Sequence, residues 1–377
     1  IRLRRRECGR VREISERIVY KMETRNIIVI GASAGGFEAL KKLVKDLPAD
    51  LPASIFVVWH MSPDVTGILP QVLARHGVLP AKNAEDLEKI EPSRIYVAPP
   101  DRHLLIENSH VRVTRGPKEN RFRPAVDPLF RSAAYSYGSR VIGVILSGAL
   151  DDGTSGLWTI KHHGGLAIVQ DPDEAEIPSM PQNAIREVEV DYIVPLAEMS
   201  ELLIRLSNEP VAKASVELID GDNKQTEFEI RTALEDKATK EIMNFGELTP
   251  YTCPECHGVL FQLKDGNRPR FRCHTGHAFS SDSLLTTVTE SIEESLWSTI
   301  RCIEESVMLL NHMGDHFSNN NQVELAAMYY KKALEAQQRG NIVRQTVMKH
   351  ERLSKDSVRE QAAGDERGSE RELAADS

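Results

Sequence analysis

Apolar residues follow two different patterns along this chain, and the pattern changes near residue 206. Before that point, short and continuously apolar runs such as NIIVIG and RVIGVILSG alternate with segments of helical spacing such as FEALKKLVKDL. Runs that are apolar throughout suit strands that are buried on both faces. Their alternation with helices predicts a doubly wound α/β domain over residues 26–206, built on a mostly parallel sheet.

The expected elements of this domain follow one another in chain order. Strands are expected at 26–31, 53–60, 94–100, 140–148, 166–170 and 192–196, and helices at 37–47, 66–77, 125–138, 153–164 and 196–207. A β-hairpin is expected around Asn108 and Ser109, because these turn residues separate two runs of strand type.

Beyond the α/β domain the pattern becomes polar, then rich in Cys and His, and finally helical. In the last part, apolar residues recur every three or four positions, which predicts a long helix that turns back at 311–322 into an antiparallel helical hairpin. The predicted boundaries are 1–25 for a basic, disordered extension, 26–206 for the α/β domain, 207–225 for a linker, 226–280 for a helix with a metal-binding module, 281–352 for the helical hairpin and 353–377 for a disordered charged tail.

Charge and composition narrow the class of function. The net charge is −9, whereas a nucleic-acid-binding surface would be basic. The longest apolar runs fall well short of the roughly 20 residues that cross a bilayer. The segment 1–21 lacks the apolar region of a secretory signal. We therefore expect a cytoplasmic protein with no transmembrane segment and no nucleic-acid partner.

A serine, Ser33, stands in the glycine-rich turn GASAGG directly after the first predicted strand. A dinucleotide-binding turn requires G-x-G-x-x-G and an acidic residue after the second strand, but that strand ends in Trp59-His60. A P-loop requires a lysine where Phe37 stands. A nucleotide-binding enzyme remains an alternative, and it predicts a higher melting temperature with NAD or ATP.

The third interpretation makes Ser33 a nucleophile. A serine at a strand-to-helix turn is presented at the carboxyl edge of the sheet, where the N-terminus of the following helix can stabilise an oxyanion. His60 ends the second predicted strand, and Asp152 follows the strand predicted with the clearest apolar pattern, 140–148, so both can reach this edge. We expect Ser33 to attack, His60 to act as general base and acid, and Asp152 to orient the imidazole. Asp151 is the competing candidate for the last role.

Five motifs in order, GASAGG, WHMSPD, YVAPPDRHL, RPAVDPLFRSAA and VILSGALDDGTSGL, resemble the catalytic domain of CheB-type protein-glutamate methylesterases. The resemblance implies the triad Ser33, His60 and Asp152 and the doubly wound parallel sheet. It also implies the substrate: glutamyl methyl esters of methylated chemoreceptor-type helical proteins, with deamidation of certain glutamines as a second activity. No cofactor is expected for catalysis.

The chain departs from the pattern of this family in two places. Ala34 stands where the family commonly has threonine, so backbone N–H groups are expected to bind the oxyanion. Residues 1–25 are too few for a phosphorylatable receiver domain, so control by phosphorylation within this segment is not expected. Among other polar residues of the motifs, Asp127 is expected either to cap its own helix or to help position a substrate helix.

Three of the five cysteines cluster with histidines in TCPEC and RFRCHTGHAF. Two close pairs of ligands separated by a hairpin suit a tetrahedral zinc ion, so a structural zinc is expected. Alternatives for the fourth ligand are His274 and His257. The expected ligands are Cys253, Cys256, Cys273 and His277.

The C-terminal helices suggest contacts with other chemosensory signalling proteins. A zinc module with a helical hairpin could recruit such a partner or gate the esterase cleft. A second hypothesis for the whole chain is a non-catalytic signalling scaffold that retains the esterase fold. A serine-reactive phosphonate separates the two hypotheses, because only the enzyme would be labelled at Ser33.

Overall fold

The computed structural model describes residues 24–61, 67–211, 220–235, 241–265, 268–351, 353–354 and 357. The expectations for the N-terminal extension and the charged tail fall almost entirely outside these residues, as do the SPD part of one motif and much of the predicted linker. Among the described helices, none is both long and apolar enough to span a bilayer.

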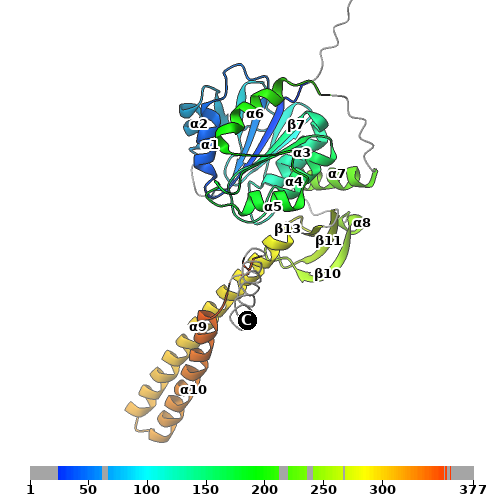
Figure 1. Ribbon diagram of the computed structural model, residues 1–377. Coiled ribbons are helices and arrows are strands. Elements are labelled where there is room, and N and C mark those ends of the chain that lie inside the picture. The colour runs from blue at the N-terminus through cyan, green and yellow to red at the C-terminus, as the bar shows by residue number, and fades with distance from the viewer. Residues whose placement is uncertain are drawn as a thin grey trace, which may run out of the picture.

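A seven-stranded parallel sheet forms the centre of the N-terminal domain, as the continuously apolar runs predicted (Figure 1). Its strand order is β3-β4-β2-β1-β7-β8-β9, so β1 lies between β2 and β7. The carboxyl ends of these three strands therefore share one edge. The strands are β1 (Ile27–Ala32), β2 (Ser54–Trp59), β3 (Ala81–Asn83), β4 (Arg94–Val97), β7 (Val141–Ile145), β8 (Leu166–Gln170) and β9 (Tyr192–Val194).

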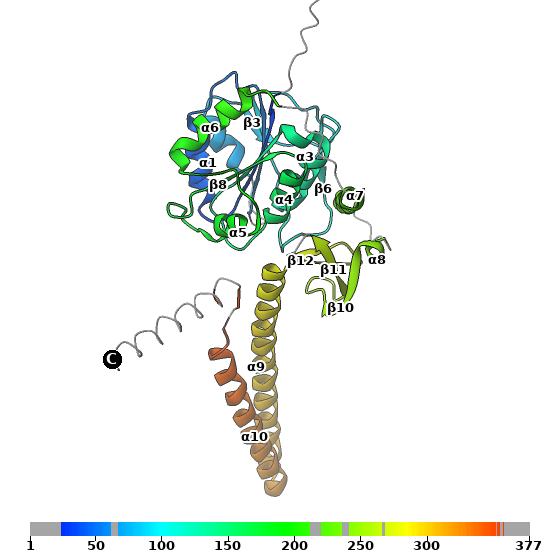
Figure 2. The same ribbon diagram turned by 45° about the vertical axis from the view of Figure 1, so that its right-hand side comes forward.

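Helices cover both faces of the sheet, which gives two apolar cores (Figures 1 and 2). Leu40 of α1, Leu73 of α2 and Leu203 of α6 belong to one core, whereas Phe130 of α3, Ile160 of α4 and Met180 of α5 belong to the other. The helices are α1 (Gly36–Lys45), α2 (Leu69–His76), α3 (Val126–Tyr137), α4 (Thr154–His162), α5 (Ser179–Glu187) and α6 (Leu196–Asn208), with a 3-10 turn η1 (Gly138–Arg140) after α3.

The predicted β-hairpin is present and two further elements are additions to the prediction. Strands β5 (His103–Glu107) and β6 (His110–Thr114) pair antiparallel around Asn108 and Ser109. The short edge strand β3 and the helix α5 lack a clear apolar pattern, since β3 is AKN and α5 contains polar residues and an internal proline.

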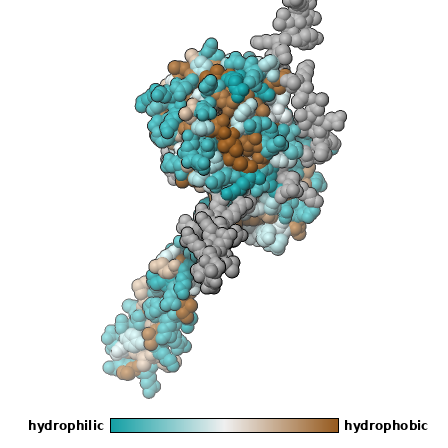
Figure 3. Space-filling view, viewed as in Figure 1, coloured by the Kyte–Doolittle hydropathy of each residue, from teal (hydrophilic) through white to brown (hydrophobic). Residues whose placement is uncertain are grey.

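The C-terminal part consists of a small antiparallel sheet and a helical hairpin that projects away from the α/β domain (Figures 1 and 2). In the space-filling view its surface is mostly hydrophilic, with scattered apolar residues (Figure 3). The elements are α7 (Asp220–Glu235), α8 (Ile242–Phe245), β10 (Gly246–Thr252), β11 (Val259–Asp265), β12 (Arg268–Cys273), β13 (Ala278–Ser280), α9 (Ser281–Asn319) and α10 (Val323–Met348).

Two predicted boundaries are wrong in this region. Helix α7 (Asp220–Glu235) begins inside the predicted linker. Part of the helix expected over 226–245 falls on residues 236–240, outside the described residues, and α8 covers Ile242–Phe245. Helix α9 continues to Asn319 through most of the predicted turn. Asp, Asn and Gly residues favour turns locally, but the partner helix α10 packs along α9 and stabilises helical backbone there.

A buried ion cluster joins the small sheet to the α/β domain. Glu229 of α7 accepts from Arg270 of β12 at 2.8 and 2.9 Å and lies 3.0 Å from Nε of Arg131 on α3. Glu119, in the loop before α3, accepts from Arg272 of β12 at 2.8 Å and from Arg131. All five side chains are buried, so each charge depends on its partners for solvation.

We expect Glu229→Gln to lower the free energy of unfolding by about 3–5 kcal/mol, because it removes a buried carboxylate while its arginine partners stay charged. Chemical denaturation monitored by circular dichroism measures this change. The control is Glu227→Gln, on the exposed side of the same helix. Its free energy of unfolding should stay within about 0.5 kcal/mol of the wild type. Equal losses in the two variants would contradict the role given to the cluster.

Candidate active site and metal centre

Ser33 lies in a tight turn between β1 and α1, at the carboxyl edge of the sheet. Its N–H donates to the carbonyl of Ser147 at 3.0 Å, and Nε1 of Trp59 donates to its carbonyl at 2.9 Å. Gly35, the N-cap of α1, has φ +74°, and a Cβ there would lie 2.5 Å from Oγ of Ser147. The turn therefore requires glycine at position 35. Residues at the ends of both neighbouring strands hold Ser33 in place.

His60 follows β2 directly and joins Ser33 to a carboxylate. Its Nδ1 lies 3.1 Å from Oγ of Ser33, and its Nε2 lies 2.8 Å from Oδ2 of Asp152. An ionised carboxylate only accepts hydrogen bonds, so Nε2 carries the proton and Nδ1 presents its lone pair to the serine hydroxyl. Three residues from different strand ends thus form one hydrogen-bonded chain, in a largely buried position.

A phenylalanine that the sequence did not single out fixes the plane of the imidazole. The ring of Phe122 stacks on His60 with 3.8 Å between the centroids and 10° between the planes. Stacking of this kind resists rotation of the histidine away from Ser33. Phe122 stands in a loop without apolar periodicity, so no pattern in the sequence marks it.

The carboxylate of Asp152 is surrounded by donors. Besides His60, the N–H of Val126 donates to Oδ2 at 2.7 Å and Nδ2 of Asn120 donates to Oδ1 at 2.9 Å. Burial alone would raise the pKa of Asp152, but the hydrogen bond and charge of His60 and the other donors lower it. Asp151, the competing candidate, accepts from Oγ of Ser280 at 2.7 Å instead.

Asp127 is buried beside this carboxylate at the start of α3. Its Oδ1 accepts from the N–H of Gly156 at 2.7 Å, and its Oδ2 accepts from Nδ2 of Asn120 at 2.9 Å. Burial, and then the negative charge of Asp152, raise the pKa of Asp127 to about 7. A protonated Asp127 leaves the negative charge of the pair on Asp152, where the imidazole needs it.

The raised pKa of Asp127 predicts a pH-dependent stability. Between about pH 4 and pH 7 the folded chain keeps a proton on Asp127 that the unfolded chain releases. Raising the pH through this range therefore favours unfolding, and stability is lost as the pH passes the folded-state pKa. We expect the free energy of unfolding of the wild type to fall relative to Asp127→Asn over this range. Parallel curves from denaturation at a series of pH values would contradict the assignment.

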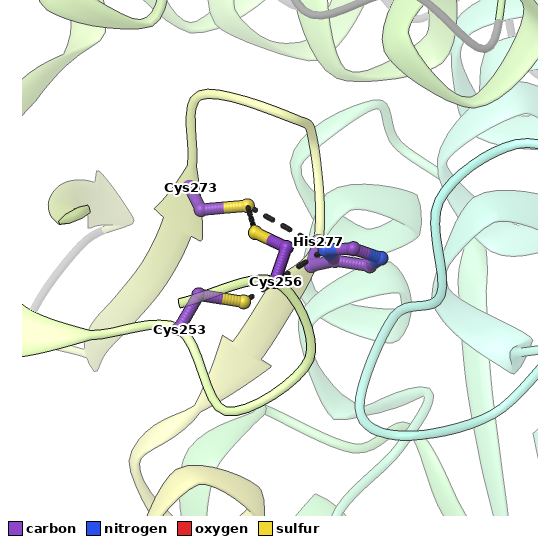
Figure 4. A group of neighbouring side chains, drawn as sticks. All are labelled: Cys253, Cys256, Cys273 and His277. Carbon is purple, nitrogen blue, oxygen red and sulfur yellow. Dashed lines mark hydrogen bonds between the residues drawn. The ribbon is translucent and has the colours of Figure 1, made fainter. Parts of the chain in front are cut away.

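Four side chains of the small sheet converge on one point (Figure 4). Their possible ligand atoms all lie within 4.8 Å of one another, with 3.6 Å between the sulfurs of Cys256 and Cys273 and 3.8 Å between Cys253 Sγ and His277 Nδ1. Ligands about 2.0–2.3 Å from a tetrahedral zinc would be separated by roughly 3.4–3.8 Å. The group therefore has the composition and spacing of a structural zinc site.

The surroundings of this cluster also suit a metal ion. The hydroxyl of Thr275 lies 2.8 Å from Cys273 Sγ and 3.0 Å from Cys256 Sγ. It is therefore within reach to donate to thiolates, as groups around metal ligands commonly do. Hydrogen bonding from Cys253, and also from His277, lowers the pKa of the Cys273 thiol. In the described part of the chain, the alternative ligands His257 and His274 are not members of the group that converges.

Comparison with known proteins identifies the family to which the α/β domain is similar. Residues 28–203 match the CheB methylesterase family. A relative from Leptospira interrogans is 43% identical over 180 residues, which are 48% of this chain and 93% of that protein. The protein-glutamate methylesterase/protein-glutamine glutaminase of Thermotoga maritima is 39% identical over 184 residues, 48% of this chain and 54% of that protein.

A solved structure is also similar. The catalytic domain of the Thermotoga maritima CheB methylesterase is 38% identical, covers 48% of this chain and 99% of that chain, and gives a TM-score of 0.47. From the sequence matches, this chain belongs to the CheB methylesterase family. The matched residues end before the small sheet and the helical hairpin.

Proposed function

We propose that this chain is a protein-glutamate methylesterase that uses Ser33, His60 and Asp152. The observation that carries the proposal is the hydrogen-bonded chain from serine hydroxyl to imidazole to buried carboxylate, at the carboxyl ends of neighbouring parallel strands. Membership of the CheB methylesterase family supports the same activity. The catalytic unit is the α/β domain over residues 26–206.

In the first half of the reaction, Ser33 Oγ attacks the carbonyl carbon of a glutamyl methyl ester while Nδ1 of His60 takes its proton. The resulting imidazolium is held and stabilised by Asp152 at Nε2. The tetrahedral intermediate collapses when Nδ1 returns the proton to the methoxy oxygen, so methanol leaves and an acyl-enzyme remains.

In the second half, water attacks the acyl-enzyme, and Nδ1 of His60 again accepts and then returns a proton. This step frees glutamate and restores the Ser33 hydroxyl. Backbone N–H groups between Ser33 and the first turn of α1 bind the oxyanion, with Ala34 adding no hydroxyl. A well-placed donor of this kind contributes roughly 3–4 kcal/mol to the transition state.

The same atoms can deamidate glutamine, because Ser33 attacks an amide carbonyl in the same way and His60 protonates the amide nitrogen, which leaves as ammonia when the C–N bond breaks. The substrate class is a methylated or amidated side chain on a chemoreceptor-type helical protein. The names of relatives such as the Thermotoga maritima enzyme carry both activities. Partners in chemosensory signalling are proposed to bind through the C-terminal helices.

A structural zinc held by Cys253, Cys256, Cys273 and His277 completes the proposal. With four protein ligands it would lack an open coordination position, so its contribution would be the folding of the small sheet. Chemistry at Ser33 does not pass through this site. The Cys3His composition and the spacing of these four side chains support the assignment.

Labelling with a fluorophosphonate tests the catalytic proposal against the scaffold hypothesis. The wild type should be modified at Ser33, because the phosphonate reacts with an activated serine. His60→Ala should lose the label while keeping the same melting temperature within a few degrees. A folded wild type that stays unlabelled would favour the scaffold, and the modified residue is identified by peptide mass spectrometry.

A further inference from the structure

One loop, residues 117–124, lies between the catalytic residues and the C-terminal part of the chain. We call the small sheet β10–β13 together with α9 and α10 the C-terminal module. On the catalytic side, Nδ2 of Asn120 donates to Asp152 Oδ1 and to Asp127 Oδ2, each at 2.9 Å. Phe122 from the same loop stacks on His60. The loop therefore contacts both the imidazole and the carboxylate that orients it.

The other side of this loop is held by the C-terminal module. The N–H of Ser280 donates to Oδ1 of Asn120 at 2.8 Å. Oγ of Ser283 can donate to the same oxygen or to the carbonyl of Ser280, each at 3.2 Å. The N–H of Asn120 donates to the carbonyl of Ala278 at 2.8 Å, which continues the pairing into β13. Arg121 forms an ion pair with Glu290 of α9.

Ser280 is the N-cap of α9, so the start of the long helix defines these contacts. Its Oγ accepts from the N–H of Ser283 at 3.0 Å, which fixes the first turn of the helix. Its Oγ also donates to Asp151. The geometry at Asn120 therefore depends on where α9 begins, and α9 begins directly after the strand that pairs with the metal-binding sheet.

The orientation of the Asn120 amide is determined by its neighbours. Its oxygen accepts from the N–H of Ser280 and its nitrogen donates to the carboxylate of Asp152, so exchange of the two atoms would break both contacts. The side chain is 5% exposed, and the backbone has φ +48°. A buried amide with complete hydrogen bonding in one orientation is suited to hold Asp152 in place beside a second carboxylate.

We propose that Asn120 is a positioning residue through which the C-terminal module completes the catalytic centre. The proposal rests on the esterase function proposed above and adds its means of control. Asn120 transmits the position of α9 to Asp152, and displacement of α9 by a partner lowers turnover without changing substrate binding. The control element thus lies after the catalytic domain in this chain.

A double-mutant cycle between Asn120→Ala and Ser283→Ala tests the proposal in the full chain. We expect Asn120→Ala to lower kcat for methanol release about 10- to 100-fold, because a small displacement of a catalytic group has effects of this size. KM should stay within about twofold, since Asn120 is buried behind His60. Ser283→Ala should lower kcat about two- to fivefold and should add nothing in the Asn120→Ala background.

The matched control is Ser291→Ala, on the exposed side of the same helix, where Oγ donates to the carbonyl of Thr287. It should keep wild-type kcat and fluorophosphonate labelling rate. Metal content and circular dichroism show whether each variant is folded. If Asn120→Ala is unstable, Ser283→Ala alone tests the inference, because it removes one hydroxyl from the C-terminal module and leaves the catalytic domain unchanged.

Additive losses in the cycle, a change confined to KM, or a wild-type labelling rate in Ser283→Ala would overturn the inference. A wild type that neither releases methanol nor is labelled at Ser33 would overturn both this inference and the proposed function. An active wild type whose variants keep full kcat would overturn this inference alone.

Discussion

Ser33→Ala is expected to abolish methanol release from a methylated chemoreceptor, with kcat reduced about 10⁴- to 10⁶-fold. The alanine side chain cannot attack the ester, so the covalent intermediate cannot form. The remaining rate comes from direct attack by water that His60 activates, with the oxyanion donors still in place. Methanol produced per chain, measured by gas chromatography at saturating substrate, is the direct readout.

The fold should survive this substitution. Only a hydroxyl is removed, and the turn is held by backbone contacts to Ser147 and by the Trp59 side chain, which do not involve Oγ. Ser318→Ala, an exposed position near the end of α9, is the control and should keep wild-type kcat. If Ser33→Ala kept turnover within tenfold of the wild type, Ser33 would not be the nucleophile, because alanine has no hydroxyl to attack the ester.

Cys273→Ala is expected to prevent binding of the proposed zinc ion and to unfold the small sheet. Structural zinc sites contribute about 10–16 kcal/mol of apparent binding energy at neutral pH, more than a sheet of this size can replace by packing. The apolar cluster around the ligands is small, and Cys253 and Cys273 are themselves part of it. Zinc content by mass spectrometry should fall from about one ion per chain to none, with increased protease cleavage in β10–β13.

Three controls make the assignment of the ligands specific. Cys302→Ser, on the exposed surface of α9, should leave the zinc content unchanged. His257→Ala and His274→Ala should also keep it, because neither histidine belongs to the converging group. Retention of a full zinc content by Cys273→Ala, or its loss in either histidine control, would contradict the proposed ligand set.

Most of the α/β domain could be predicted from local pattern. Continuous apolar runs specify strands that are buried on both faces, and the glycine-rich turn marks the point where β1 gives way to α1. The two pairs of proposed metal ligands can be recognised in the sequence because close ligands within one knuckle are a local feature. The elements that were missed, β3 and α5, lack apolar periodicity and take their shape from the larger sheet beside them.

The sequence by itself determined which chemical groups stand at the ends of the strands: a serine after β1, a histidine after β2 and a pair of aspartates after β7. Only the tertiary structure decided that Asp152 and not Asp151 faces His60, and that Nδ1 faces Ser33. It also decided that Asn120 bridges Asp152 to the start of α9. The same holds for Glu229, which lies between an arginine of the α/β domain and an arginine of the small sheet. Local pattern can specify an element and the residue that follows it, whereas hydrogen bonds between residues far apart in the chain depend on how the folded elements pack.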